Sequence, residues 1–288
     1  MTDKNRCTNE IEPSQRYGTI GPMGRAGLTA LFLVWSWAGV RAQEPADLLT
    51  QARVLYNEGR FEAAVDAAER ARVTPALVDR ADLIAARAFL ERYRETVAIK
   101  DLTSARDRLR RINPQSFDAR ERAEFIVGLG ETLYFDGSFG AAADLLQLVL
   151  EGGSSTLDPE ARERVLDWWA IAVDREAWTK SFAEQQVFYE RIRDRMRGEL
   201  NVRPESPTAG YWAASAARSQ GDINGAWDAA EAGWVRAVLA KDRGAQLRAA
   251  LDQIMLLAIV PERARALGQS EEELRLMWEQ FKELWKED

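Results

Sequence analysis

Apolar residues recur at intervals of three and four positions along most of the chain after residue 42. The run of Leu48, Leu49, Ala52, Leu55 and Tyr56 is typical of this pattern. Such spacing places the apolar side chains on one face of an α-helix. Alternation of apolar and polar residues, which marks a half-buried β-strand, is almost absent. We therefore expect an all-α protein in which each helix buries one face.

Turn-forming residues divide this pattern into helices of about 12 to 20 residues each. The breaks fall at residues 57–59, 74–75, 113–114, 136–137, 152–155, 158–159, 204–207, 220–222 and 261. These breaks predict about eleven or twelve helices. Because the connections are short, we expect neighbouring helices to pack antiparallel.

Three segments share one spacing around a glycine, at Gly59, Gly137 and Gly221. In each segment a small residue lies seven positions before the glycine, a large apolar residue two after it and an alanine five after it. Glycine tolerates the left-handed conformation that ends the first helix of a hairpin, and small residues let two helices approach closely. The three segments therefore predict three helical hairpins with similar turns.

This pattern resembles the tetratricopeptide repeat (TPR). Residues 59–64, Gly-Arg-Phe-Glu-Ala-Ala, are the clearest match. The glycines are 78 and 84 residues apart, so each interval holds one further, divergent hairpin, and the first of these has Tyr93 where a glycine is expected. The resemblance implies an all-α, TPR-like right-handed α-solenoid of about five helical hairpins over residues 43–268.

In the resembled family the first helix of each hairpin lines a groove that holds a peptide or a partner's helix. The corresponding positions in this chain are Leu49, Arg53, Tyr56, Asn57, Arg87, Glu91, Val127, Glu131, Tyr134, Phe135, Tyr211, Ser215 and Arg218. The resemblance thus implies a non-enzymatic scaffold or adaptor for a protein or peptide partner. Two alternatives stay open: Tyr56 and Tyr134 pack between repeats, or the arginines form ion pairs on a solvated face.

The last helix is expected within residues 269–288, where apolar residues form a single stripe. The stripe consists of Leu274, Met277, Trp278, Phe281, Leu284 and Trp285. The final hairpin of a solenoid exposes an apolar face, and a terminal helix with a polar outer surface usually covers it. We therefore expect a C-terminal capping helix, and a helix that docks on a second protein or a membrane surface is the alternative.

Residues 26–40 are the one long apolar stretch, and at 15 residues they are shorter than the roughly 20 needed to cross a bilayer. Arg25 precedes them, and Val40-Arg41-Ala42 follows as a small-x-small cleavage pattern. We therefore expect residues 1–42 to be an N-terminal extension and signal peptide cleaved after Ala42, with Met23 as an alternative start. The mature protein would be periplasmic or secreted, without a stable membrane anchor.

The amino-acid composition excludes several kinds of catalytic and metal site. The chain has no histidine and one cysteine, Cys7, which precedes the expected cleavage site. These absences exclude histidine-based catalytic triads and most zinc sites, so we expect no cofactor and no metal. A net charge of -7 offers no general attraction for nucleic acid, whose binders usually carry a basic surface.

Two other functions remain open. One is a solute-binding or transport-accessory role in the cell envelope, since some exported TPR-like proteins serve transporters. The other is a carboxylate-based peptidoglycan-cleaving enzyme, because an exported helical solenoid is similar to soluble lytic transglycosylases, in which a glutamate followed by serine is catalytic. Glu205-Ser206 is the corresponding pair here, but it lies in a proline-rich connection with no sign of the desolvated cleft that an acid catalyst requires.

We predict that the mature protein begins at Gln43. Sequencing the N-terminus of protein from a periplasmic or secreted fraction checks this prediction. Mature protein that retains residues 1–42 would contradict it.

Overall fold

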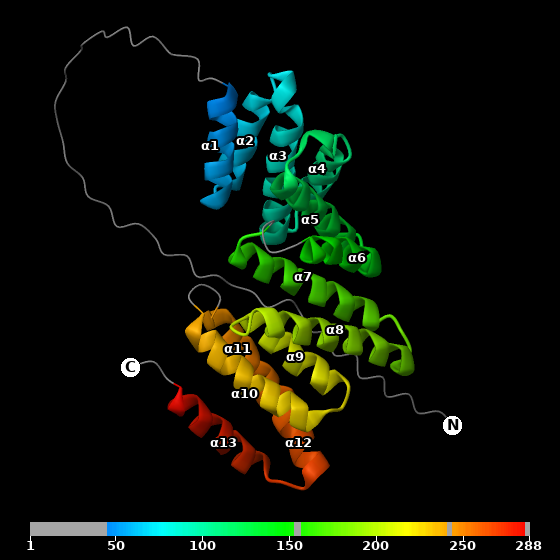
Figure 1. The fold of residues 1–288 in the computed structure, drawn as a ribbon, viewed down its shortest axis with the longest axis vertical. Coiled ribbons are helices and arrows are strands. Elements are labelled where there is room, and N and C mark those ends of the chain that lie inside the picture. Colours follow the sequence, from blue (N-terminus) through cyan, green and yellow to red (C-terminus); the bar gives the residue numbers. More distant parts are fainter. Residues whose placement is uncertain (1–44, 153–156, 241–243, 286–288) are drawn as a thin grey trace, which may run out of the picture. The chain divides into compact units, whose positions relative to one another are not determined.

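The computed structural model describes residues 45–152, 157–240 and 244–285, and these residues form helices and turns without any β-strand (Figure 1). The all-α prediction is therefore confirmed for this part of the chain. The expected signal peptide, Cys7 and the alternative start at Met23 lie outside the described residues. No helix within the described ranges is long and apolar enough to cross a membrane.

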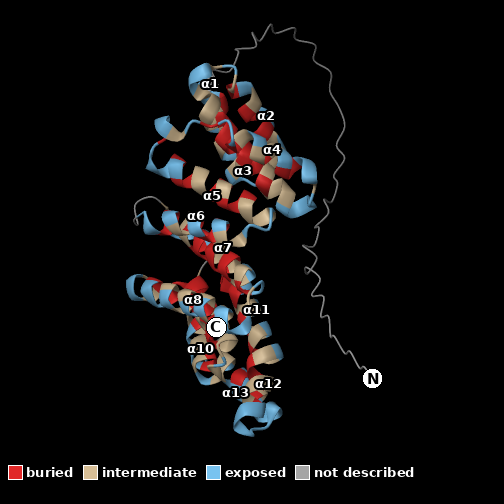
Figure 2. Ribbon diagram, turned by 90° about the vertical axis from the view of Figure 1, so that its right-hand side faces the viewer, coloured by how far each residue is buried: buried red, intermediate tan, exposed pale blue. Residues whose placement is uncertain are grey.

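The helices follow one another with short connections. Their bounds are α1 Pro45–Asn57, α2 Phe61–Ala71, α3 Val78–Thr96, α4 Ile99–Leu109, α5 Ala119–Phe135, α6 Phe139–Glu151, α7 Pro159–Ala177, α8 Phe182–Val202, α9 Pro207–Ser219, α10 Ile223–Leu239, α11 Gly244–Ile254, α12 Val260–Leu267 and α13 Glu271–Leu284. Each helix from α1 to α10 packs against the next one along the chain. In addition, α1, α3, α5, α7, α9 and α11 form a row in which each contacts the next. Buried residues lie on the faces that these helices turn toward one another (Figure 2).

Glycine ends the first helix of three hairpins, as the sequence predicts. Gly59, Gly137 and Gly221 follow α1, α5 and α9 with φ angles of 73°, 78° and 80°, a region that favours glycine because it has no Cβ. In the second hairpin Tyr93 lies inside α3, and the turn comes four residues later at Val97, with φ 55°. The helix is longer than the repeat pattern predicts, and its left-handed end carries a β-branched residue.

Small residues permit close contact between helices. A Cβ on Gly130 of α5 would lie 3.1 Å from the Leu146 side chain of α6. The α9–α10 contact is tighter, because a Cβ on Gly210 would lie 2.8 Å from the Cα of Gly233. At this second crossing the two backbones meet with no room for a side chain between them.

The expected break at Pro261 does not occur. Helix α11 continues through a π-helical turn, Met255–Ile259, directly into α12. Within the turn the Val260 N–H bonds the carbonyl of Met255, five residues earlier. Proline lacks an N–H and its ring clashes with the carbonyl four residues before it in a regular α-helix. The wider turn immediately before Pro261 accommodates both restrictions, so the chain stays helical.

Helix α13 packs against α12, but only part of its apolar stripe is buried. Leu274 and Trp278 are buried, and the Trp278 Nε1–H donates to Asp252 Oδ1 of α11 at 2.8 Å. Met277 and Trp285 are 49% and 45% exposed, so part of the stripe faces solvent. The six positions span a wider arc of the helix than the α11–α12 surface contacts.

We predict that Trp278→Ala lowers the free energy of unfolding by about 3 to 5 kcal/mol, because it removes a fully buried indole and leaves a cavity. Trp285→Ala, at the C-cap of the same helix, is the matched control and should change it by less than about 1 kcal/mol. Urea unfolding of both variants measures the difference. Equal losses of unfolding free energy in the two variants would show that α13 does not pack through Trp278.

Candidate functional site

A cleft of about 920 Å³ lies between α1, α3, α5 and the start of α7. Seven of the residues that the sequence predicts for the groove line it together: Arg53, Tyr56, Asn57, Arg87, Glu91, Val127 and Glu131. They come from three hairpins, and the row of odd-numbered helices brings them to one surface. These side chains, which are up to 78 residues apart in sequence, therefore share one cavity.

Sequence reasoning missed eight further polar or aromatic residues of the cleft: Phe61, Arg94, Arg120, Glu124, Asp158, Glu160, Arg164 and Trp168. Glu124 and Arg120 lie seven positions before Glu131 and Val127, so extending the helical stripe on α5 by two turns would have found them. The residues of α7 had no such signal, because the fourth hairpin has no glycine that sets its register.

The other predicted groove residues lie elsewhere. Leu49 is half-buried in the core formed by α1, α2 and α3. Tyr134 and Phe135 line a separate cavity of about 420 Å³ beside Trp178. In α9, Tyr211, Ser215 and Arg218 do not reach the large cleft. The Arg218 guanidinium instead forms an ion pair with Glu262 of α12 at 2.6 Å.

One buried carboxylate, Glu124 of α5, ties the walls of the cleft together. Arg53 of α1 lies 3.1 Å from its Oε1, Arg87 of α3 lies 3.2 Å from its Oε2, and Arg120 of α5 lies 3.2 Å from Oε1. Burial raises the pKa of Glu124, but the charges of Arg87 and Arg53 outweigh it and hold that pKa below its usual value. Glu124 is therefore a carboxylate shared by three guanidinium groups.

A second set of contacts surrounds Glu91 of α3. Its carboxylate accepts a hydrogen bond from the Tyr56 hydroxyl at 3.4 Å and pairs with Arg94 at 2.8 Å. The Arg94 guanidinium lies 5.3 Å from the Trp168 ring centroid, and that of Arg87 lies 4.6 Å from the Tyr56 ring centroid. Burial raises the pKa of Tyr56 to about 12, so its hydroxyl remains a donor at neutral pH. Arg87 is thus paired with a carboxylate on another helix and Arg94 with one on its own helix.

Glu131 differs from the other acidic residues of the cleft. It is buried, and among the described residues it makes no hydrogen bond or ion pair. Burial, followed by the nearby charge of Glu91, raises the pKa of Glu131 to about 7, although Arg94 and Arg87 act in the opposite direction. The carboxyl of Glu131 therefore gains and loses its proton near neutral pH.

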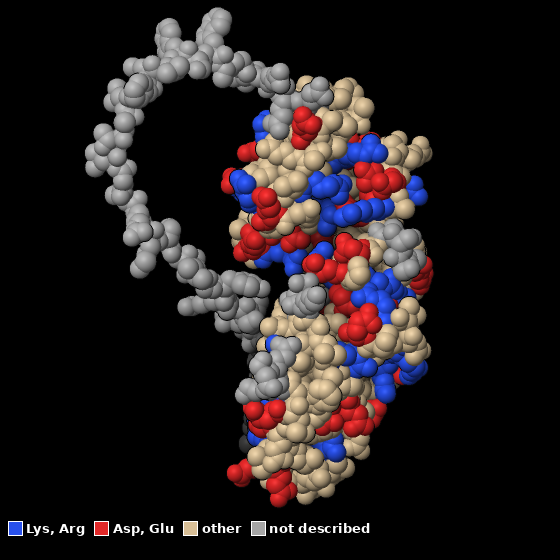
Figure 3. Space-filling model, turned by 60° about the vertical axis from the view of Figure 1, so that its left-hand side comes forward, with Lys and Arg blue, Asp and Glu red and all other residues tan. Residues whose placement is uncertain are grey.

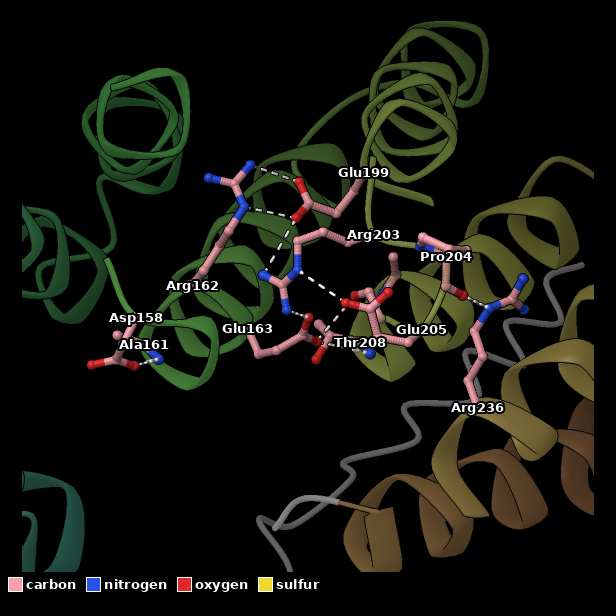
Figure 4. A network of polar contacts seen from close by, with 12 residues as sticks. Asp158, Ala161, Arg162, Glu163, Glu199, Arg203, Pro204, Glu205, Thr208 and Arg236 are labelled. Atoms are coloured by element: carbon pink, nitrogen blue, oxygen red, sulfur yellow. Dashed lines mark hydrogen bonds and ion pairs between the residues drawn. The ribbon is translucent and has the colours of Figure 1, made fainter. Parts of the chain in front are cut away.

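The Glu205-Ser206 pair lies in a structural network that joins α7, α8 and α9 (Figure 4). Ser206 caps α9 by accepting the Ala209 N–H, and its hydroxyl donates to buried Glu163 at 3.1 Å. Arg203 donates to Glu163 at 3.0 Å. The Glu205 side chain is 67% exposed, so this position lacks the desolvation that raises the pKa of an acid catalyst.

Positive and negative side chains are interspersed on one face of the molecule (Figure 3). On the face shown in Figure 3, Lys and Arg side chains lie directly beside Asp and Glu side chains. No group of three or more Cys, Asp or Glu residues in the described ranges is arranged to hold a metal ion. Comparison of the chain with models of known protein families, with curated proteins and with solved structures found no match.

We predict that Glu131→Gln stabilises the protein at pH 8 by up to about 3 kcal/mol and has little effect at pH 4.5. The pKa of the Glu131 carboxyl is raised in the folded protein, so the folded state binds more protons than the unfolded chain between about pH 4.5 and 7. Wild-type stability therefore falls as pH rises through this range, whereas the uncharged amide avoids the loss.

Urea unfolding at several pH values measures the gap between Glu131→Gln and wild type. Glu95→Gln, an exposed position on α3 outside the cleft, makes the same charge change and should show no such pH-dependent gap. A constant gap for Glu131→Gln would mean that its carboxyl titrates normally.

Proposed function

We propose that this protein is an exported, TPR-like scaffold or adaptor of the cell envelope, periplasmic or secreted, that binds an extended segment of a partner protein. The observation that carries this proposal is the cleft of about 920 Å³ lined by first helices of successive hairpins. In helical-repeat proteins the concave surface formed by such helices is the usual binding surface.

The contacts between helices support the repeat arrangement. Each odd-numbered helix from α1 to α11 contacts the next odd-numbered helix, which is the order expected when hairpins stack in one direction. Three of the turns use glycine in the same left-handed conformation. A right-handed solenoid of about five hairpins, closed by α13 as a cap, is consistent with these observations.

The side chains of the cleft support peptide binding. Five arginines line it, and ion pairs hold each of them in place before a ligand arrives. Side chains that are already ordered lose less entropy when they bind. Asn57 is exposed at one edge, and its amide can both donate to and accept from the backbone of an extended chain.

A solute-binding role is the second candidate, because a cleft of about 920 Å³ falls within the usual size range of small-molecule sites. Native mass spectrometry of the purified protein distinguishes the two, since a co-purified small molecule favours the solute. The exposed position of Glu205 gives no support to the peptidoglycan-cleaving alternative.

We predict that a photo-crosslinking residue placed at Asn57 captures a discrete partner in cells, because this position borders the cleft and is exposed. The same probe at Thr103, exposed on α4 outside the cleft, is the control and should capture no discrete partner. A third probe at Met277, exposed on α13, tests the docking-helix alternative. Capture at Met277 alone would contradict binding in the cleft.

A further inference from the structure

The acidic and basic groups of the cleft pair almost completely. Arg53, Arg87 and Arg120 share Glu124, Arg94 pairs with Glu91, and Arg164 pairs with Glu160. Asp158 caps α7 by accepting the Ala161 N–H. Every arginine of the cleft therefore has a carboxylate partner. Among the lining carboxyls, Glu131 is the one to which the described residues provide no hydrogen bond or ion pair.

The charged groups around Glu131 come from four helices. Helix α3 contributes Arg87, Glu91 and Arg94, and α7 contributes Glu160 and Arg164. Helix α1 contributes Arg53 and Tyr56, and α5 itself carries Arg120 and Glu124. Two other helices, α4 and α6, also pack on α5, but neither places a residue in the cleft lining. With Glu131 and the other four carboxyls ionised, the five arginines and five carboxylates of the lining cancel.

We propose that Glu131 receives a primary ammonium group, the side chain of a lysine in the bound segment, and that the ligand enters by displacing the proton of the carboxyl. This inference rests on the proposed peptide-binding function. The protonated carboxyl and the ammonium group react to give a carboxylate paired with the ammonium, and one proton leaves to solvent. The charge of the cleft is the same before and after this exchange, so the five arginines do not oppose it.

The geometry favours lysine over arginine at this position. A guanidinium group binds well when it stacks on an aromatic ring or forms two parallel hydrogen bonds. In this cleft the Arg87 guanidinium lies over the Tyr56 ring and that of Arg94 over the Trp168 ring. The third ring of the lining, Phe61, lies 5.8 Å from the Tyr56 ring. An ammonium group is a compact charge with three donors and needs no free ring face. Glu91, whose charge raises the pKa of Glu131, gives the ammonium a second nearby carboxylate.

The replacement of the Glu131 proton by an ammonium group determines how ligand affinity depends on pH. Below about pH 7 the Glu131 carboxyl holds its proton, and an entering ammonium must displace it. Affinity for a lysine-containing ligand therefore rises with pH, by up to about tenfold per unit below the pKa, and levels off above it. A ligand that accepted a hydrogen bond from the protonated carboxyl would show the opposite dependence.

The first experiment uses a positional library of end-blocked nonapeptides, with binding of the best sequences measured by calorimetry from pH 6 to pH 8. We expect a lysine preference at one position, proton release on binding, and an affinity at least about tenfold lower for Glu131→Gln. Glu95→Gln, the matched control, should bind as wild type does. Peptide binding without a lysine preference would overturn the inference and leave the proposed function standing. An unchanged peptide affinity in Glu131→Gln would do the same.

The second experiment tests the ammonium site without a peptide. Carboxyl carbon NMR follows the titration of Glu131, identified by its loss in Glu131→Gln, with added n-butylammonium or tetramethylammonium chloride. We expect n-butylammonium to lower the pKa of Glu131 by at least half a unit more than the tetramethylammonium control, on the order of a threefold preference. Equal effects of the two salts would overturn the inference. A selective effect with no peptide binding in the library would support the ammonium site and contradict the peptide function.

Discussion

The architecture depends on close packing between helices whose contact faces consist of alanine and glycine. On α2, Ala64, Ala67, Ala68 and Ala71 are all buried without exposed surface. At the α9–α10 crossing the contact is made by glycine backbone. Such faces bring helix axes close together, and larger residues there would push neighbouring hairpins apart. Because the hairpins are close, an arginine on α1 can reach a carboxylate on α5 and the walls of the cleft can be joined by side chains.

The fold could be predicted where the decisive signal is local. Gly59, Gly137 and Gly221 mark turns because their conformation requires a residue without a Cβ, and this constraint is visible in the sequence. Val97 carries no such mark, because a β-branched residue rarely adopts the left-handed conformation and nothing in the sequence indicates it there. Pro261 was misread for the same reason: proline usually ends a helix, and only the structure shows the π turn that accommodates it.

The candidate site could be predicted in part. The repeat register placed Arg53, Arg87 and Glu131 on one surface because it fixes which residues of each first helix face the same way. It could not assign partners, because the contact between Arg53 and Glu124 joins residues 71 positions apart. Nor could it reveal the raised pKa of Glu131, which arises from burial and from Glu91 on another helix.

The link from Arg53 to Glu124 also has a mechanical consequence. Helical-repeat proteins can flex along their length because each repeat contacts only its neighbours. Here an ion pair joins α1 directly to α5, although the hairpin of α3 and α4 lies between them in sequence. Bending that separates the first and third hairpins must break this pair and expose a buried carboxylate. The N-terminal part of the stack should therefore be stiff under load, and the width of the cleft should change little when the protein is pulled or crowded.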